Sequence, residues 1–420
     1  MNGGAVRARS TVAITLAGAV LIGCGTATDP PRPSVSHAVE SSTTTAPRAL
    51  EPPRVDPALA GAFDSAVVST MQSLSVPGVI ARVDTPTGSW STAHGVADLR
   101  SGRPIDAGDH VRIGSVTKTM VATVLLQLSD EGLIRLDDPV SRIRDDVPNG
   151  DAITVRMLLD MTSGLYSYTE DSYFGEAMDR TPQRVWTSDE LLRIAWAHGP
   201  DFPPGARFRY SNTNTVLAAA LAEQVTGRSW RDLVGERVIR PLGLAQTTVP
   251  EPGDHLLPSP SARGYLYGTN ASAQVSVQRP ADEVTAIRNG TVLPTDVSEL
   301  DPTWIDAAGA VVSTVSDVAD YITALVRGGL SSPATQSERV ASIADVTPFD
   351  TVNYGLGWQG FGHLVGHDGA IPGYQTFAGH DPKSGVTIVV VCTVRDGPAG
   401  GRPANTIARA FADRLGISGS

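Results

Sequence analysis

Ser115 and Lys118 are the residues of this chain whose types and spacing most directly suggest chemistry. They begin an apolar run that recurs at helical spacing until Gly132, so we expect both side chains on one face of a helix. A serine hydroxyl becomes a good nucleophile when a neighbouring base takes its proton, and a neutral lysine can be that base. The pKa of lysine, about 10.4 in water, must fall for this, and both apolar surroundings and a helix N-terminus lower it.

The lysine itself supports this interpretation. The chain has 33 Lys plus Arg residues, of which only Lys118 and Lys383 are lysines. Elsewhere the sequence uses arginine, which does not give up its proton in a protein. A titratable amine therefore follows Ser115 in a chain that otherwise almost never uses one.

Tyr210 and Asn212 form a second candidate pair, just before a predicted helix. A tyrosine close to a deprotonatable lysine can relay a proton to a leaving group. An asparagine that caps the helix behind a packed tyrosine would give the same pattern.

His367-Asp368-Gly369-Ala370 ends a predicted strand and precedes the turn Pro372-Gly373. Gly369 would let a substrate lie against the strand edge, and a backbone amide there could stabilise an oxyanion. A plain hairpin with an exposed histidine is the alternative.

Composition and missing motifs exclude several classes of function. No Gly-x-Ser-x-Gly, His-Glu-x-x-His, Cys-x-x-Cys or Gly-x-Gly-x-x-Gly motif occurs. His363 and His367 are four residues apart on a strand-like segment, which does not indicate a metal site, and we expect no metal. The net charge of −11 and the pI near 5.2 argue against nucleic acid or anionic lipid head groups as partners. Nothing in the sequence indicates an oligomeric state.

The N-terminus predicts export. Arg7 and Arg9 precede an apolar run over residues 12–22 that is too short to span a membrane, as in a secretory signal. Its end, Leu-Ile-Gly-Cys, resembles the lipobox of bacterial lipoproteins. We therefore expect a signal peptide over 1–23, a lipidated Cys24, a Pro/Ser/Thr-rich tether over 24–56, and a location at the extracytoplasmic face of the cell membrane. The other cysteine, Cys392, is expected on a buried strand. Because lipidation would occupy Cys24, we expect no intrachain disulfide.

Residues 57–420 predict one α+β domain. Strand-like segments occur near both chain ends, at 78–83, 89–96, 354–360, 362–367, 374–379 and 386–394. Helical patterns occur at 57–74, 154–161, 188–197, 213–226, 314–326 and 405–415. This order predicts an antiparallel sheet flanked by helices (about 57–134 and 307–420) with an inserted, mostly helical region (about 135–306). Residues 250–303 have no clear periodicity and are expected to shape a substrate pocket between the two lobes.

Three elements in this order, Ser115-x-x-Lys118, Tyr210-x-Asn212 and His367-x-Gly369, resemble the serine β-lactamase and penicillin-binding protein superfamily. The resemblance is to the branch with class C β-lactamases, D-alanyl-D-alanine carboxypeptidases and esterases. It extends from about residue 57 to residue 415 through further family-like segments at 131–140, 158–165, 204–212, 241–244 and 354–358.

The resemblance implies a β-lactamase-like fold and an acyl-enzyme mechanism without a cofactor. Ser115 would attack a carbonyl, and Lys118 and Tyr210 would share the proton transfers. Asn212 would hold the substrate amide or steady Lys118. The backbone amides of Ser115 and Ala370 would form the oxyanion hole.

One departure bears on the substrate. β-Lactamases and most penicillin-binding proteins carry Lys-Thr-Gly or Lys-Ser-Gly where this chain has His-Asp-Gly, so the fixed cation that meets a drug carboxylate is replaced by His367. We therefore expect a D-alanyl-D-alanine carboxypeptidase of penicillin-binding type acting on a small or peptidoglycan-type acyl substrate. The alternatives are an esterase or amidase, a weak β-lactamase, and a non-catalytic sensor or scaffold. The intact Ser115, Lys118 and Tyr210 argue against the last.

Overall fold

The computed structural model describes residues 55–274, 279–344 and 346–419. The predicted signal peptide, the lipidation site Cys24 and all of the tether except its last two residues lie outside the described residues. Within the part that is described, no helix is both long enough and apolar enough to cross a bilayer.

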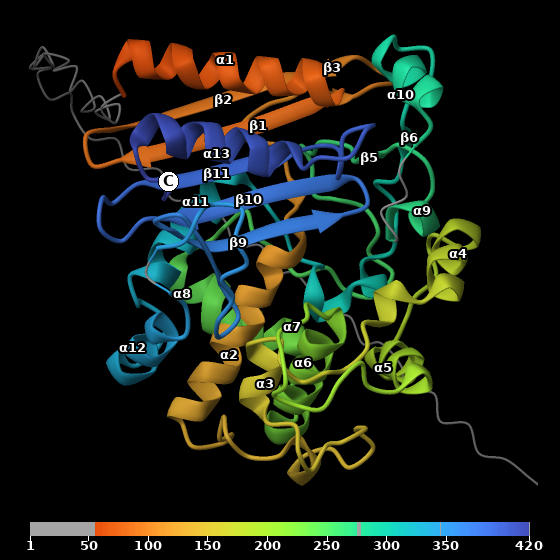
Figure 1. Cartoon of the computed structure of the whole chain (residues 1–420), viewed down its shortest axis with the longest axis vertical. Coiled ribbons are helices and arrows are strands. Elements are labelled where there is room, and N and C mark those ends of the chain that lie inside the picture. Colours follow the sequence, from red (N-terminus) through yellow and green to blue (C-terminus); the bar gives the residue numbers. More distant parts are fainter. Residues whose placement is uncertain (1–54, 275–278, 345, 420) are drawn as a thin grey trace, which may run out of the picture. The chain divides into compact units, whose positions relative to one another are not determined.

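A seven-stranded sheet joins the two ends of the domain, in the order β3-β2-β1-β11-β10-β9-β8 (Figure 1). The central pair is antiparallel, with Val79 opposite Cys392 and Asp84 opposite Thr387. This confirms the predicted antiparallel sheet built from both chain ends. The strands are β1 (Gly78–Thr85), β2 (Gly88–Asp98), β3 (Arg103–Pro104), β8 (Gln359–Phe361), β9 (Leu364–Ile371), β10 (Tyr374–His380) and β11 (Thr387–Cys392).

Two helices, α1 (Pro57–Leu74) and α13 (Pro403–Leu415), cover one face of the sheet. Asp56 caps α1 by accepting from the amides of Ala58 and Leu59, which explains why the helix begins where the apolar pattern begins. The side chains between these helices and the sheet form a separate apolar cluster that includes Phe63, Phe377, Val390 and Phe411. Cys392 is fully buried in this layer, as predicted.

The opposite face packs on α11 (Val315–Val326) and, through the larger apolar cluster, on the inserted helical region. In Figure 1, green helices of the inserted region lie beside α2 (Thr117–Asp130). The remaining α-helices are α3 (Val155–Leu159), α4 (Ser172–Arg180), α5 (Ser188–His198), α6 (Asn212–Thr226), α7 (Trp230–Val234), α8 (Arg240–Leu242), α9 (Asn270–Gln274), α10 (Ala281–Arg288) and α12 (Pro333–Ala341).

Short elements complete the region near the cleft. Two small antiparallel pairs are β4 (Val111–Arg112) with β7 (Val312–Ser313) and β5 (Tyr265–Leu266) with β6 (Thr295–Asp296). The 3-10 turns used below are η1 (Gly114–Val116), η3 (Tyr168–Glu170), η5 (Pro302–Trp304) and η6 (Asp306–Ala308).

The predicted strand over 354–360 is wrong, because only its last two residues enter β8. Gly357 has a φ of +71°, and a Cβ there would lie 2.2 Å from the Ala122 side chain. The chain therefore turns closely over α2 at this point instead of extending. The Gly357 amide donates to the Leu159 carbonyl at 2.9 Å, which fixes the turn.

Candidate active site

Ser115 lies in the turn η1 and not in the α-helix that was expected, which starts at Thr117. Gly114 adopts a φ of +56°, a left-handed conformation that glycine reaches at little steric cost. Ser115 is 9% exposed and lines a cavity of about 390 Å³. Although the local structure differs, the spacing still brings Lys118 Nζ to 3.0 Å from Ser115 Oγ.

Strand β9 lies directly against this turn. A Cβ on Gly369 would lie 2.2 Å from the Ile113 carbonyl oxygen and 3.1 Å from the Ser115 nitrogen. A Cβ on Gly114 would lie 3.3 Å from the Ala370 nitrogen. Glycine is therefore required for the close approach, which places the backbone of Ala370 beside the serine turn.

Lys118 is buried and makes two short hydrogen bonds besides its contact with Ser115. Its Nζ donates to Asn212 Oδ1 at 2.8 Å and to the Ala308 carbonyl at 2.6 Å. Burial lowers the pKa of Lys118 well below its usual value, while the Asp368 carboxylate opposes this in part. The neutral amine is therefore favoured in the folded protein.

The number of donors on Lys118 determines what the amine can do. A neutral amine has two N–H donors and one lone pair. Asn212 Oδ1 and the Ala308 oxygen are acceptors and take both donors, so the lone pair is left for the Ser115 hydroxyl proton. With both donors taken, a neutral Lys118 can accept the proton of Ser115.

Asn212 is the first residue of α6; the N-cap is Ser211, which makes no side-chain capping hydrogen bond. Asn212 Nδ2 donates to Thr169 Oγ1 at 2.9 Å, which fixes the amide so that Oδ1 faces Lys118. Asn212 thus contacts Lys118 and also lines the cavity, so both roles that the resemblance implied remain predictions.

Tyr210 lines the same cavity, with its ring centroid 5.0 Å from Lys118 Nζ. Burial raises the pKa of its phenol, and a hydrogen bond with Ser115 opposes the rise. The phenol therefore stays protonated at neutral pH and can donate a proton near Ser115.

His367 differs from the expectation of a histidine that meets a substrate carboxylate. Its side chain is 0% exposed, and Tyr354 contacts it with the hydroxyl 3.2 Å from Nε2. The other ring nitrogen meets the Asp368 carbonyl. Burial lowers the pKa of His367 to about 4, and the Asp368 carboxylate opposes this in part. The ring is therefore neutral and covered, and the cavity-lining residues of this strand are Asp368 and Ala370.

A pH dependence follows for substrates with a carboxylate. With a pKa of about 4, His367 stays neutral between pH ~5.5 and ~7.5. We compare kcat/KM for acyl-D-Ala-D-Ala with kcat/KM for a neutral ester, and we expect titration of His367 to leave the ratio of the two unchanged over this range. Steady-state kinetics with both substrates would measure the ratio. A fall of about fivefold over this range would contradict the burial of His367 and place it in contact with the carboxylate.

The same shift links His367 to stability. The pKa of His367 is about 4 in the folded state and about 6.5 in the unfolded state, so between these pH values the unfolded chain binds the proton more readily. The free energy of unfolding is therefore highest above pH ~6.5 and falls as pH drops towards 4. Between pH ~7 and ~5 the free energy of unfolding should fall by about 2 kcal/mol through this residue. Urea unfolding of the wild type and His367→Gln at both pH values isolates the effect, because the other histidines are common to both. Equal pH dependence in the two proteins would contradict it.

The cavity carries charged residues that the sequence did not indicate. Arg402, at the start of α13, donates to Asp368 Oδ2 at 2.8 Å, and Asn405 donates to the same oxygen at 3.0 Å. Arg395 and Glu170 also line the cavity. No spacing could have indicated Arg402, because it meets Asp368 only through the pairing of β9, β10 and β11 with α13.

No metal centre is evident among the residues that the structure describes. Across 55–274, 279–344 and 346–419, no group of three or more His, Cys, Asp or Glu side chains is arranged to hold a metal ion.

Comparisons with known proteins agree with this geometry. Penicillin-binding protein 4* of Bacillus subtilis (strain 168) is 26% identical over 299 residues, which cover 67% of this chain and 60% of that protein. The chain therefore spans about three fifths of this curated relative.

Solved structures extend the likeness. A D-stereospecific amidohydrolase from Streptomyces sp. superposes with a TM-score of 0.69 at 33% identity, covering 84% of this chain and 98% of that chain. A D-amino acid amidase from Ochrobactrum anthropi SV3, solved with L-phenylalanine amide, gives 0.70 at 26% identity, covering 85% and 99%. The Beta-lactamase family profile matches residues 63–413. The chain belongs to the Beta-lactamase family and is a serine hydrolase of that family.

Proposed function

We propose that this protein hydrolyses amide bonds of small D-amino-acid amides or peptides through an acyl-enzyme on Ser115. The observation that carries the proposal is the pair of acceptors on Lys118, Asn212 Oδ1 and the Ala308 oxygen, which leave the amine lone pair for the serine proton. The alternatives in the same class are an esterase and a weak β-lactamase.

In the acylation step, Ser115 Oγ bonds to the substrate carbonyl carbon while its proton passes to Lys118. The oxyanion would accept from the backbone amides of Ser115 and Ala370, which the close approach at Gly369 supports. Tyr210 gives its proton to the leaving nitrogen as the C–N bond breaks, and Lys118 returns a proton to Tyr210. Water then attacks the ester and restores Ser115.

Support for the substrate class comes from the cavity and from the relatives. A cavity of about 390 Å³ lies in the range of small-molecule sites. It carries both signs of charge, with Glu170 and Asp368 opposed by Arg395 and Arg402, which suits an amino-acid derivative. The similar solved structures are named for D-stereospecific amide hydrolysis.

The test compares hydrolysis of D- and L-phenylalanine amide, N-acyl-D-Ala-D-Ala, a neutral nitrophenyl ester and penicillin, with intact-protein mass spectrometry of each mixture. We expect turnover of D-phenylalanine amide at least tenfold above the L-enantiomer. Hydrolysis of the ester alone would replace the proposal with an esterase. A stable penicilloyl adduct without amide turnover would replace it with a penicillin-binding role.

A D-alanyl-D-alanine carboxypeptidase is the second candidate, because Arg395 and Arg402 both line the cavity and could meet a terminal carboxylate. Arg402→Gln should then lower kcat/KM for N-acyl-D-Ala-D-Ala while leaving D-phenylalanine amide, which has no carboxylate, unchanged. Equal losses on both substrates would remove this candidate.

We also propose that Cys24 is lipidated and anchors the domain at the extracytoplasmic face of the cell membrane. The support is the charged start, the short apolar run and the lipobox-like Leu-Ile-Gly-Cys end.

Lipidation of Cys24 has a direct test. The wild-type protein should fractionate with membranes and carry lipid mass on its N-terminus, whereas Cys24→Ala should be released or remain an unprocessed precursor. Mass spectrometry of the N-terminal peptide and fractionation measure both. A wild-type protein that is wholly free of membranes and lipid would contradict the anchor.

A further inference from the structure

The carbonyl of Ala308 is one of the two acceptors that orient Lys118, and it comes from the end of η6, 190 residues along the chain. Because this acceptor is a backbone oxygen, its position is set by the conformation of the turn η6. Just before this turn, Trp304 at the end of η5 and Ile305 line the cavity. Whatever fixes this turn also sets the direction of the lysine lone pair.

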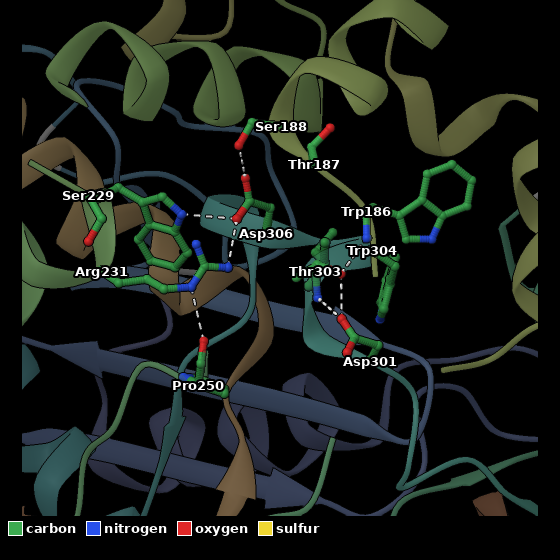
Figure 2. Close-up of polar contacts among 12 residues, drawn as sticks. Trp186, Thr187, Ser188, Ser229, Arg231, Pro250, Asp301, Thr303, Trp304 and Asp306 are labelled. Carbon is green, nitrogen blue, oxygen red and sulfur yellow. Dashed lines mark hydrogen bonds and ion pairs between the residues drawn. The ribbon is translucent and has the colours of Figure 1, made fainter. Parts of the chain in front are cut away.

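Asp306, the first residue of η6, fixes the turn through its carboxylate. Oδ1 accepts from Trp230 Nε1 at 2.9 Å and from the Arg231 guanidinium at 3.1 Å, and Oδ2 accepts from Ser188 Oγ at 2.7 Å. Figure 2 shows Ser188 and Arg231 reaching Asp306 from different segments, and the Pro250 carbonyl accepting from Arg231 Nε. The carboxylate is buried, so these contacts are not shared with solvent.

The backbone at Asp306 is in an unfavourable conformation that these contacts maintain. Its φ is +45°, the left-handed region, which residues other than glycine adopt rarely. Its carbonyl accepts from the amides of Gly309 and Ala310 at 3.1 and 3.0 Å, which closes the turn around Ala308. The side chain thus holds a conformation that directs the Ala308 carbonyl at Lys118.

The charge of Asp306 is balanced locally. Arg231 pairs with it, and the other titratable groups near it are Glu223 on α6 and Tyr168 on η3. The carboxylate whose charge acts on Lys118 is Asp368 on β9, with Tyr210 and His367 as the other titratable neighbours of the amine. An effect of Asp306 on Lys118 therefore passes through the backbone of the turn.

We propose that Asp306 is a positioning residue for the reaction: anchored by Ser188, Trp230 and Arg231, it holds the Ala308 carbonyl so that neutral Lys118 points its lone pair at Ser115. This inference rests on the proposed acyl-enzyme chemistry at Ser115 and not on the identity of the substrate.

The test measures the rate at which a fluorophosphonate labels Ser115 in the full chain from pH ~6 to ~9.5. The rate is divided by the fraction of molecules that can be labelled at all. The serine oxygen displaces fluoride and its proton passes to Lys118, so the rate reports the base directly. Asp306→Gly removes the three contacts but tolerates the left-handed φ, whereas Asp306→Asn tolerates that φ and keeps an acceptor for Trp230. Asp301→Ala is the matched control, because Asp301 is also buried and accepts from Thr303 in the preceding turn η5 (Figure 2) and from the Gly253 amide.

We expect Ser115 in Asp306→Gly to be labelled at least tenfold more slowly per molecule able to react. The midpoint of its rate against pH should move by on the order of half a unit or more. Asp306→Asn should recover most of the labelling rate. Asp301→Ala should keep the wild-type midpoint and a rate within about twofold, even if its melting temperature falls. If Asp306→Gly does not fold, Ser188→Ala removes one contact and should slow labelling two- to threefold. A wild-type rate and midpoint in Asp306→Gly, or in Ser188→Ala where Asp306→Gly does not fold, would overturn the proposal. Labelling that persists in Ser115→Ala would instead overturn the proposed function.

Discussion

Ser115→Ala should abolish covalent labelling and substrate turnover while leaving the fold intact. The substitution removes the proposed nucleophile, the Ser115 Oγ that lies 3.0 Å from Lys118 Nζ. In a serine protease with a Ser-His-Asp triad, loss of the nucleophile lowers kcat on the order of 10⁶-fold, and we expect a comparably large loss here. The fold should tolerate the change because the residue is small and lies at the cavity surface.

Intact-protein mass spectrometry after fluorophosphonate treatment provides the measurement. Ser313→Ala is a suitable control, because Ser313 is also buried but its hydroxyl bonds to Thr247, away from the cavity. The control should be labelled fully. Full labelling of Ser115→Ala would place the nucleophile on another residue.

Lys118→Arg should be nearly as damaging as Lys118→Ala. Arginine keeps the positive charge and roughly the length, but it does not give up its proton and has no lone pair for the serine hydroxyl. Loss of a general base costs on the order of 10²–10⁴-fold in rate. The variant should therefore lose activity because it cannot accept the serine proton, whereas burial lowers the pKa of Lys118 and favours an amine that can. In the wild type, activity should fall as pH drops through that pKa, because protonation occupies the lone pair.

The chain supplies a matched control for this substitution. Lys383, its other lysine, is exposed in the turn between β10 and β11, so Lys383→Arg makes the same chemical change away from the cavity. The measurement is kcat/KM for both variants. If Lys118→Arg retained more than about a tenth of wild-type kcat/KM, charge and not proton transfer would be the property that matters.

Spacing in the sequence indicated the contact between Lys118 and Ser115, and the family resemblance added Asn212. Lys118 lies three residues along, and Asn212 meets Lys118 across the cleft because α6 begins at that residue. The contribution of Ala308 could not be predicted, because a backbone carbonyl leaves no trace in residue type. The burial of His367 could not be predicted from the sequence either, because its contact with Tyr354 depends on the turn at Gly357 before β8.

The fold was predictable where local signals were strong. The first helix runs over the predicted residues, 57–74, because Asp56 caps it and Ser75 ends it in the left-handed conformation. The segment over 354–360 has an apolar pattern typical of a strand, yet its glycines serve a tight turn over α2. The sequence pattern alone does not show whether a glycine lies within a strand or in a turn that ends it.

The pairing of β1 with β11 makes this a protein of high contact order. Val79 and Cys392 face each other across the centre of the sheet, so the sheet cannot close until almost the whole chain has been synthesised. Proteins dominated by such distant contacts fold slowly, because the entropy of closing the loop is lost before the contacts form. Ser115 is synthesised long before β9, which completes its surroundings at Gly369 and Ala370. A nascent chain therefore carries its nucleophile in an unassembled site, and acylating activity should appear only when the last strands have docked.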